Sequence, residues 1–198
     1  MKTVEILCME LTTGATNALY EKNDQQHEKA VHLLSGSSLS LNGEILEQQL
    51  STVNIKEGKE IQRFQLQEGD VVLLAKGNSI RAGYVTSKVA SLNVIASANF
   101  ILLRPNRDKL LGEVLVSHFN SLTGQNALDL ISTGAVIKNI SISNIKKLEI
   151  ELPEMEKQQE IAELFHARNE AYQSILNFAE QQKKVASACI SQLMKGAA

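Results

Sequence analysis

The stretch Glu68-Gly69-Asp70-Val71-Val72-Leu73-Leu74-Ala75-Lys76-Gly77 contains the clearest strand signal in the sequence. Glu-Gly-Asp is typical of a turn, and the four apolar residues after it are too few for a helix and half of them β-branched. The sequence therefore predicts a buried strand over residues 71–74. The polar run Lys76-Gly77-Asn78-Ser79 predicts a flexible loop that leaves this strand.

On both sides of this strand, the apolar pattern predicts further elements. Residues 4–9 and 94–103 are apolar enough for strands, and Arg104-Pro105 ends the second. Apolar residues spaced by three and four predict an amphipathic helix over residues 108–122, with a second, shorter helix over residues 125–131. Isoleucines over residues 137–142 and strict alternation over residues 148–152 predict a return to strands.

The last part of the chain differs in kind, because residues 154–195 contain no glycine and no proline. We expect one long helix there, about 60 Å in length if straight. Pro153 suits its first position, and Glu154 and Glu156 place negative charge at its positive end. Heptad spacing predicts an apolar stripe that pairs with a second helix in a coiled coil. The residues expected at this dimer interface are Ile161, Leu164, Phe165, Tyr172, Ile175, Phe178, Val185, Cys189 and Leu193.

These elements predict an α+β protein of two parts. The chain has 198 residues, of which 43% are hydrophobic, and this is enough for one buried core without disulfides. We expect a globular, β-rich domain with short helices over residues 1–152, followed by one long C-terminal coiled-coil helix over residues 153–198. The simplest alternative for the helix is that it folds back over its own domain.

Charge is distributed unevenly along the chain, although the net charge is only −2. Residues 1–70 hold 6 basic and 11 acidic residues, and residues 148–198 hold 5 and 8. Residues 71–147 hold 9 basic and only 3 acidic residues, a net charge of +6. Such a segment can be the footprint of a phosphate backbone, or it can be cancelled by acidic neighbours in space.

No catalytic constellation stands out. Cys8 and Cys189 lie far apart, and the four histidines, His27, His32, His118 and His166, show no metal-ligand spacing. The sequence has no phosphate-binding Gly-Lys-Ser/Thr loop and no Gly-x-Gly turn after a strand. We therefore predict no metal and no cofactor. No apolar run reaches 18 residues, so we expect neither a membrane span nor a signal peptide, and a reducing cytoplasm as the setting.

Four segments, in order, resemble the specificity subunits of type I restriction–modification enzymes. They are residues 67–77, with Gly69-Asp70 before the apolar strand; residues 95–105, ending in Arg104-Pro105; residues 134–141; and residues 148–161, which lead into the long helix. The resemblance covers roughly residues 40–198. Glu154 stands where the family often has a second proline, and Lys157 precedes Gln158 where the family usually has Glu.

The resemblance implies that the chain is non-catalytic and reads double-stranded DNA. Family members typically carry two target-recognition domains, each followed by a long helix, whereas this chain has room for one of each. It is therefore expected to act as a homodimer on a site with inverted-repeat halves and to dock methyltransferase subunits, with or without a restriction subunit. The side chains placed near DNA are Lys76, Asn78, Ser79, Arg81, Lys88, Asn99, Lys138 and Asn139.

Two other functions fit the same sequence. One is a protein-interaction module whose helix serves only for dimerisation. The other is a stand-alone DNA-binding regulator without a methyltransferase. Salt-dependent binding to duplex DNA separates DNA reading from the interaction module, and capture of a methyltransferase separates the specificity subunit from the regulator.

Overall fold

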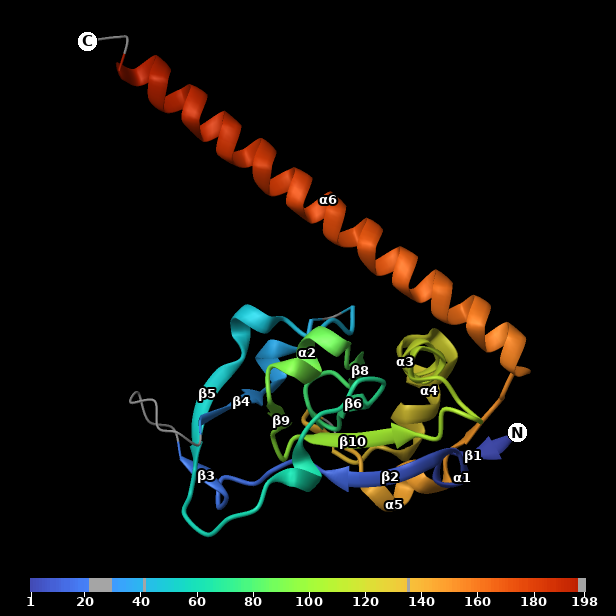
Figure 1. The fold of residues 1–198 in the computed structure, drawn as a ribbon. Coiled ribbons are helices and arrows are strands. Elements are labelled where there is room, and N and C mark those ends of the chain that lie inside the picture. The colour runs from blue at the N-terminus through green and yellow to red at the C-terminus, as the bar shows by residue number, and fades with distance from the viewer. Residues whose placement is uncertain (22–29, 41, 135, 196–198) are drawn as a thin grey trace. The chain divides into compact units, whose positions relative to one another are not determined.

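The computed structural model describes residues 1–21, 30–40, 42–134 and 136–195 (Figure 1). The strands are β1 (Lys2–Thr3), β2 (Cys8–Thr13), β3 (Tyr20–Glu21), β4 (Ala30–Leu34), β5 (Ser51–Ile55), β6 (Val71–Leu74), β7 (Lys76–Gly77), β8 (Arg81–Tyr84), β9 (Val94–Ala96), β10 (Phe100–Pro105), β11 (Lys138–Asn139) and β12 (Glu149–Ile150). The helices are α1 (Val4–Leu7), α2 (Ser87–Ser91), α3 (Gly112–Asn120), α4 (Leu122–Ile131), α5 (Ile142–Lys147) and α6 (Met155–Lys195). Short 3-10 turns cover Gly36–Ser38, Glu47–Gln49 and Gln62–Phe64.

Two four-stranded sheets form the centre of the domain. One has the order β2-β10-β6-β8 and is antiparallel throughout. The other has the order β3-β5-β4-β9, in which β4 and β9 are parallel and the other pairs antiparallel. All four residues of β6 are buried, which confirms the predicted strand, because β6 lies between β10 and β8.

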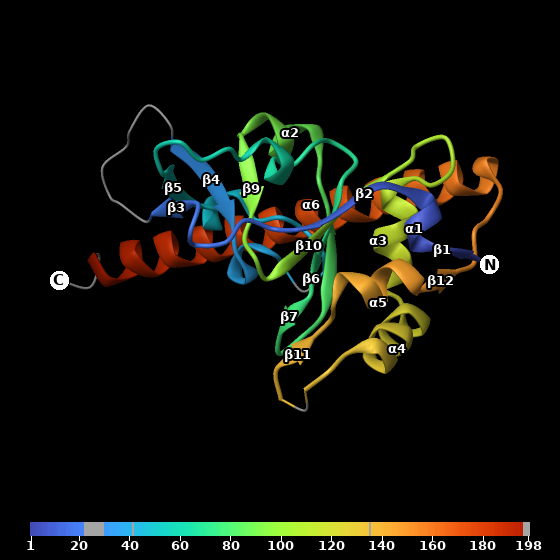
Figure 2. The same ribbon diagram turned by 90° about the horizontal axis from the view of Figure 1, so that it is seen from below.

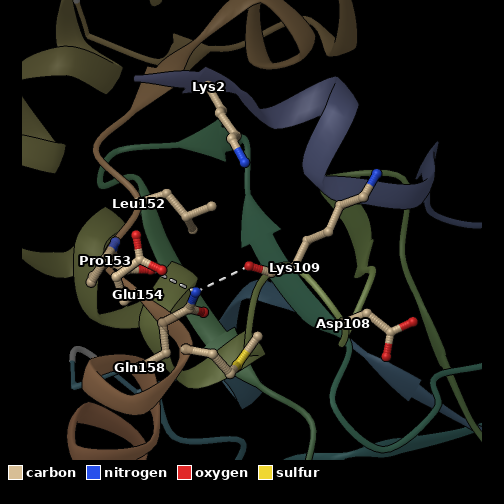
Figure 3. Close-up of a pocket in the computed structure, with 8 residues that line it drawn as sticks. Lys2, Asp108, Lys109, Leu152, Pro153, Glu154 and Gln158 are labelled. Atoms are coloured by element: carbon tan, nitrogen blue, oxygen red, sulfur yellow. Dashed lines mark hydrogen bonds between the residues drawn. The ribbon is translucent and has the colours of Figure 1, made fainter.

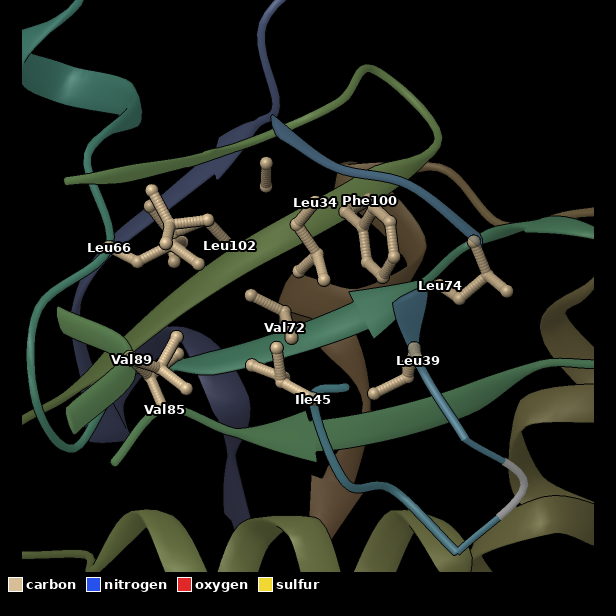
Figure 4. Packing of buried hydrophobic residues seen from close by; sticks show 12 residues of the cluster. Leu34, Leu39, Ile45, Leu66, Val72, Leu74, Val85, Val89, Phe100 and Leu102 are labelled. Atoms are coloured by element: carbon tan, nitrogen blue, oxygen red, sulfur yellow. The ribbon is translucent and has the colours of Figure 1, made fainter. Parts of the chain in front are cut away.

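The main hydrophobic core lies between the two sheets. Leu34 from β4 packs in one cluster with Val72 from β6 and Phe100 from β10 (Figure 4). Successive residues of a strand point to opposite faces, so Leu33 and Ile95 join a second cluster with Phe64. The sheet that contains β4 and β9 is therefore buried on both of its faces.

Several predicted elements begin or end elsewhere. Residues 4–9 do not form one strand, because the first four of them form α1, which buries Val4 and Leu7, three residues apart. Residues 94–103 form two strands in different sheets, separated by a turn in which the Phe100 amide donates to the Ser97 carbonyl at 2.9 Å. Tertiary pairing decides both outcomes, since apolar content alone is the same in either case.

Serine caps explain two further differences. The predicted helix 108–122 is α3, which starts later and ends at Asn120. The hydroxyl of the next residue, Ser121, accepts from the Gly124 amide at 3.0 Å and caps the start of α4. The isoleucine run at 137–142 does not continue as a strand, because the Ser141 hydroxyl caps α5 through the Asn144 amide. Of the strands predicted over residues 148–152, only β12 forms.

The C-terminal helix is confirmed as a single α6 of 41 residues. The Gln158 amide donates to the Glu154 carbonyl at 3.0 Å, so Pro153 lies just before the helix rather than at its first position. The chain divides into two compact units, Met1–Gln159 and Glu160–Ala198. The first five residues of α6, 155–159, therefore belong to the unit that contains the sheets.

Candidate nucleic-acid interface

A short two-stranded ribbon brings together the two polar segments that the sequence singled out. In it β7 and β11 are antiparallel, with Lys76 opposite Asn139 and Gly77 opposite Lys138. The Ile140 amide donates to the Ala75 carbonyl at 2.9 Å and extends the pairing toward β6. Figure 2 shows the ribbon extending from the end of β6, away from α2. Residues more than sixty positions apart in the sequence thus share one surface.

Asn99 joins this surface from a third segment. It lies in the turn between β9 and β10, not within a strand as the sequence predicted. Its carbonyl accepts from the Ala75 amide at 2.9 Å and from the Lys76 amide at 3.1 Å, while its side chain is exposed. We call the set of six predicted residues on the ribbon, its loop and this turn the ribbon surface: Lys76, Asn78, Ser79, Asn99, Lys138 and Asn139.

The Arg81 guanidinium is engaged inside the domain and does not face solvent with the ribbon surface. Its Nε donates to the carbonyls of Leu39 and Ser40 at 3.1 Å, and its Nη2 donates to the carbonyls of Gly36 and Leu39 at 2.7 Å. Its Nη1 donates to the Ser79 hydroxyl at 2.7 Å, and burial lowers the pKa of the guanidinium. Arg81 thus fastens the 36–40 segment to β8, and we do not include it in the ribbon surface.

Lys88 lies apart from the ribbon. It is on α2, beyond the end of β8 that is remote from Arg81, and Figure 2 shows α2 and the ribbon on opposite sides of the domain. Its ammonium is 2.9 Å from a carboxylate oxygen of Glu47, and its side chain is 73% exposed. An exposed ion pair of this kind contributes at most about 1 kcal/mol to the free energy of unfolding. The Lys88 side chain therefore remains accessible to solvent and is held only weakly by Glu47.

Acidic neighbours cancel much of the positive charge of residues 71–147. Lys88, Arg104 and Lys146 pair with acids from the first 70 residues, and Lys138 pairs with Asp129. Of the nine bases in the segment, Lys76 and Lys147 are the two whose side-chain ammonium groups form no ion pair or hydrogen bond with another described residue. The charge along the sequence therefore overstated the charge in space, and Lys76 is the free cation of the ribbon surface.

Two of the sequence motifs form one buried ion pair. The Asp70 side chain is 1% exposed, and its two carboxylate oxygens accept from Nε and Nη2 of Arg104 at 2.9 and 3.0 Å. Arg104 also donates from Nη1 to Glu10 at 2.7 Å, and Asp70 accepts from the Gln67 amide at 2.7 Å. Gly69, with φ of +86°, makes the turn that presents Asp70. This pair joins β2 and β10 to the turn that precedes β6, at the end of β6 opposite the ribbon.

The loop that leads into β11 is closed by backbone bonds. The Thr133 amide donates to the Asn139 carbonyl at 2.9 Å, and the Asn139 amide donates back to Thr133 at 2.8 Å. Gly134 has φ of +90°, and a Cβ there would lie 2.3 Å from the Ile137 carbonyl oxygen. Only glycine fits this position. Lys138 ties the same loop to α4 through Asp129.

A pocket of about 300 Å³ lies where the first turn of α6 begins (Figure 3). Gln158 is 1% exposed beside it, and its Oε1 accepts from the Leu111 amide at 3.0 Å. Its Nε2 donates to the carbonyls of Lys109 and Pro153, both at 3.0 Å. The Leu111 amide and the Lys109 and Pro153 carbonyls each have a hydrogen-bond partner in Gln158. In the family-like segment 148–161, this glutamine therefore anchors the start of α6.

The predicted interface residues on α6 are largely exposed. Ile175 and Phe178 are 65% and 62% exposed, whereas Phe165 is only 5% exposed and Ile161 is half-buried. Leu164, Tyr172, Val185, Cys189 and Leu193 are all exposed as well. The heptad pattern missed Leu176, Ile190 and Met194, which are also exposed and follow stripe positions by one residue. A wider stripe of neighbouring columns would have included them.

No group of three or more His, Cys, Asp and Glu side chains in the described part of the chain could hold a metal ion. His27 lies outside the described residues. None of the described helices has the length and apolar character needed to cross a bilayer.

The chain matches known proteins over most of its length. The family model for the type I restriction modification DNA specificity domain matches residues 15–183. The fold is similar to the S subunit of a type I restriction–modification system from M. genitalium, with a TM-score of 0.57 and 17% identity over 92% of this chain and 42% of that one. It is also similar to the HsdS subunit from Thermoanaerobacter tengcongensis, with a TM-score of 0.56 and 16% identity over 92% of this chain and 45% of that one.

A third similar structure comes from a study of complex assembly and conformational transition of the type I system, with a TM-score of 0.60 and 18% identity over 92% of this chain and 45% of that one. The chain thus spans less than half the length of the solved proteins that it resembles. A comparison with curated protein sequences gives no match.

Proposed function

Because this chain belongs to the type I restriction–modification DNA specificity family, we propose that it recognises a specific sequence in double-stranded DNA and directs a methyltransferase to it. The family match over residues 15–183 is the observation that carries the proposal. The ribbon surface supports it, because an exposed cation and several exposed amides from distant segments meet there. Phosphate contacts position a protein on DNA, and side-chain amides read base edges.

In this proposal the ribbon enters a groove. A two-stranded ribbon fits the width of the DNA major groove. The Lys76 ammonium would contact a phosphate, and the exposed amides of Asn78 and Asn139 would face base edges. The ion pair of Arg104 and Asp70 would act only through the rigidity of the sheet beneath.

We further propose that α6 pairs with α6 of a second copy. Its apolar side chains from Tyr172 onward are exposed along the helix, and a helix this long has to bury such a stripe. Residues 154–174 carry five acidic and two basic side chains, while residues 175–195 carry one acidic and three basic. This asymmetry favours antiparallel pairing, in which each acidic half meets a basic half.

An antiparallel homodimer would bring two recognition domains together. Two identical readers related by a twofold axis should select a site with inverted-repeat halves. Methylation, and any cleavage, would reside in partner subunits that dock on this dimer, since specificity subunits of the family are non-catalytic in general. Such a role places the protein with the DNA in the cytoplasm.

DNA binding is tested by the fluorescence anisotropy of a labelled duplex pool of random sequence, with the full chain alone and with a type I methyltransferase subunit. We expect binding at about 50 mM salt that weakens steeply by about 200 mM. Lys76→Ala should reduce the slope of log affinity against log salt by about one, because one phosphate contact is lost. Lys59→Ala removes another exposed lysine, one outside the ribbon, and serves as the control. The absence of binding to any duplex under both conditions would refute the proposal.

Dimerisation is tested by sedimentation. Ile175→Asp with Phe178→Asp should give monomers, because both side chains are exposed in one chain and their replacement leaves its own core intact. Ser191→Asp, in a heptad column of α6 that holds only polar residues, should leave the dimer unchanged. Mild oxidation separates the orientations, since a parallel pair would join the two Cys189 thiols and an antiparallel pair would not. A monomeric wild-type chain would overturn the dimer and leave DNA recognition to be judged on its own assay.

A further inference from the structure

Two apolar side chains are exposed beside the ribbon. Val136 is 81% exposed and Ile137 is 64% exposed, and they come directly before Lys138 of β11. Valine and isoleucine are among the residues most often buried in proteins. The function proposed above assigns no role to either side chain, although both lie beside the residues proposed to contact DNA.

Hydrogen bonds close the base of the loop that carries these two side chains. Thr133 and Asn139 exchange two hydrogen bonds across the base of the loop, and the Thr133 hydroxyl donates to the Asn139 carbonyl at 3.1 Å. Gly134 permits the close approach of its backbone to the Ile137 carbonyl. A side chain on a loop closed at its base loses little freedom when it meets a ligand, and this favours binding.

The surroundings of the apolar pair indicate the kind of partner. Asn139 and Lys76 face each other on the ribbon, and both are exposed. Surfaces that bind proteins usually present an extended apolar patch with few lysines at its centre. A small apolar contact within a frame of cation and amides matches the major groove instead, where the 5-methyl group of thymine lies between polar base edges and phosphates.

We propose that Val136 and Ile137 read thymine 5-methyl groups in the major groove of the recognised half-site. This inference rests on the proposed function, because it assigns a base type to a surface that would enter DNA. It makes these two residues determinants of specificity, distinct from the cation and amides of the ribbon surface.

The test replaces thymine by deoxyuridine, which removes the methyl group and changes no hydrogen-bonding group. A duplex enriched from a random pool by the wild-type chain, with the methyltransferase subunit if binding requires it, is remade with one deoxyuridine at each thymine in turn. Loss of one buried methyl group should weaken binding about fourfold at the contacted thymine, which corresponds to about 0.8 kcal/mol.

Variants assign the effect to the two side chains. Val136→Ser with Ile137→Ser should bind thymine and deoxyuridine duplexes equally. Its thermal unfolding midpoint should match the wild type, because both side chains are exposed. Leu122→Ser alters a similarly exposed apolar residue on α4, 80% exposed, and should keep the fourfold sensitivity.

The outcomes separate this inference from the function on which it rests. If the wild-type chain enriches no sequence, the proposed function is wrong and the inference fails with it. If a sequence is enriched that contains no thymine, or that is insensitive to deoxyuridine at every position, DNA recognition stands and the inference is wrong. A double-serine variant that retains the sensitivity also overturns it.

Discussion

Arg104→Ala should strongly destabilise the domain, because it leaves a buried carboxylate without its counter-ion. The variant removes both guanidinium bonds to Asp70, whose side chain is 1% exposed, and leaves that carboxylate with the hydrogen bond from the Gln67 amide. Breaking a buried ion pair from one side typically costs about 3–5 kcal/mol. For a chain of this size the melting temperature should fall by roughly 6–20 °C.

The assay is urea unfolding followed by circular dichroism, with calorimetry for the melting temperature. Lys88→Ala is the matched control, because it breaks a surface pair with Glu47 and should change the free energy of unfolding by less than about 1 kcal/mol. The double variant Asp70→Ala with Arg104→Ala should be more stable than Arg104→Ala alone, since it removes the orphaned charge. The reasoning would be refuted if Arg104→Ala lowered the free energy of unfolding no more than Lys88→Ala does. It would also be refuted if the effects of Asp70→Ala and Arg104→Ala on that free energy were strictly additive in the double variant.

The same variant should acquire a pH dependence. Burial already raises the pKa of Asp70 in the wild-type protein, against the lowering caused by its bonds to Arg104 and Gln67, so loss of Arg104 should raise that pKa further. A carboxyl whose pKa is higher in the folded than in the unfolded state favours folding below the unfolded pKa of about 3.9, and loses that contribution as pH rises through the folded pKa. The stability deficit of Arg104→Ala should therefore be smallest near pH 4 and grow toward neutral pH. A deficit that shrinks as pH rises would contradict this sign.

Three further predictions concern single sites. Gln158→Leu should lower the free energy of unfolding by about 3 kcal/mol in urea titrations, because it leaves one buried amide and two carbonyls without the glutamine; a change below 1 kcal/mol would contradict the anchoring role. Burial raises the pKa of the Cys8 thiol to about 12, so at pH 8 a maleimide should modify exposed Cys189 at least a hundredfold faster than Cys8, with equal rates in denaturant. Gly134→Ala places an alanine at φ of +90°, which strains the backbone by about 1–3 kcal/mol. The variant should lose more free energy of duplex binding than free energy of unfolding. Unchanged binding would show that DNA recognition does not need this loop shape.

Elements with one strong local signal were predicted well. The absence of glycine and proline after Pro153 predicts α6, and the apolar run at 71–74 predicts β6; both form as expected. Elements with an ambiguous signal were predicted poorly. The region at 137–142 looked like a strand from its isoleucines, although the Ser141 hydroxyl starts a helix there. A cap depends on one hydrogen bond, which apolar periodicity does not register.

The candidate site shows the same division. Lys76, Asn78 and Asn139 were chosen from their chemistry, and they lie on one surface. Arg81 and Lys88 were chosen on the same grounds, yet Arg81 holds an internal loop and Lys88 lies on α2. Chemistry alone does not separate a cation that binds a backbone carbonyl from one that faces solvent.

The sequence by itself determined the long helix, the buried central strand and the family, because each depends on an order of residues that is read along the chain. Only the tertiary structure decided which charges remain free. Arg104 pairs with an acidic residue more than thirty positions away, and Lys146 pairs with one more than a hundred positions away. The net charge of a segment does not show which of its bases form such ion pairs. It also decided that β7 pairs with β11, since hydrogen bonds between strands depend on their separation in space and not on their separation along the chain.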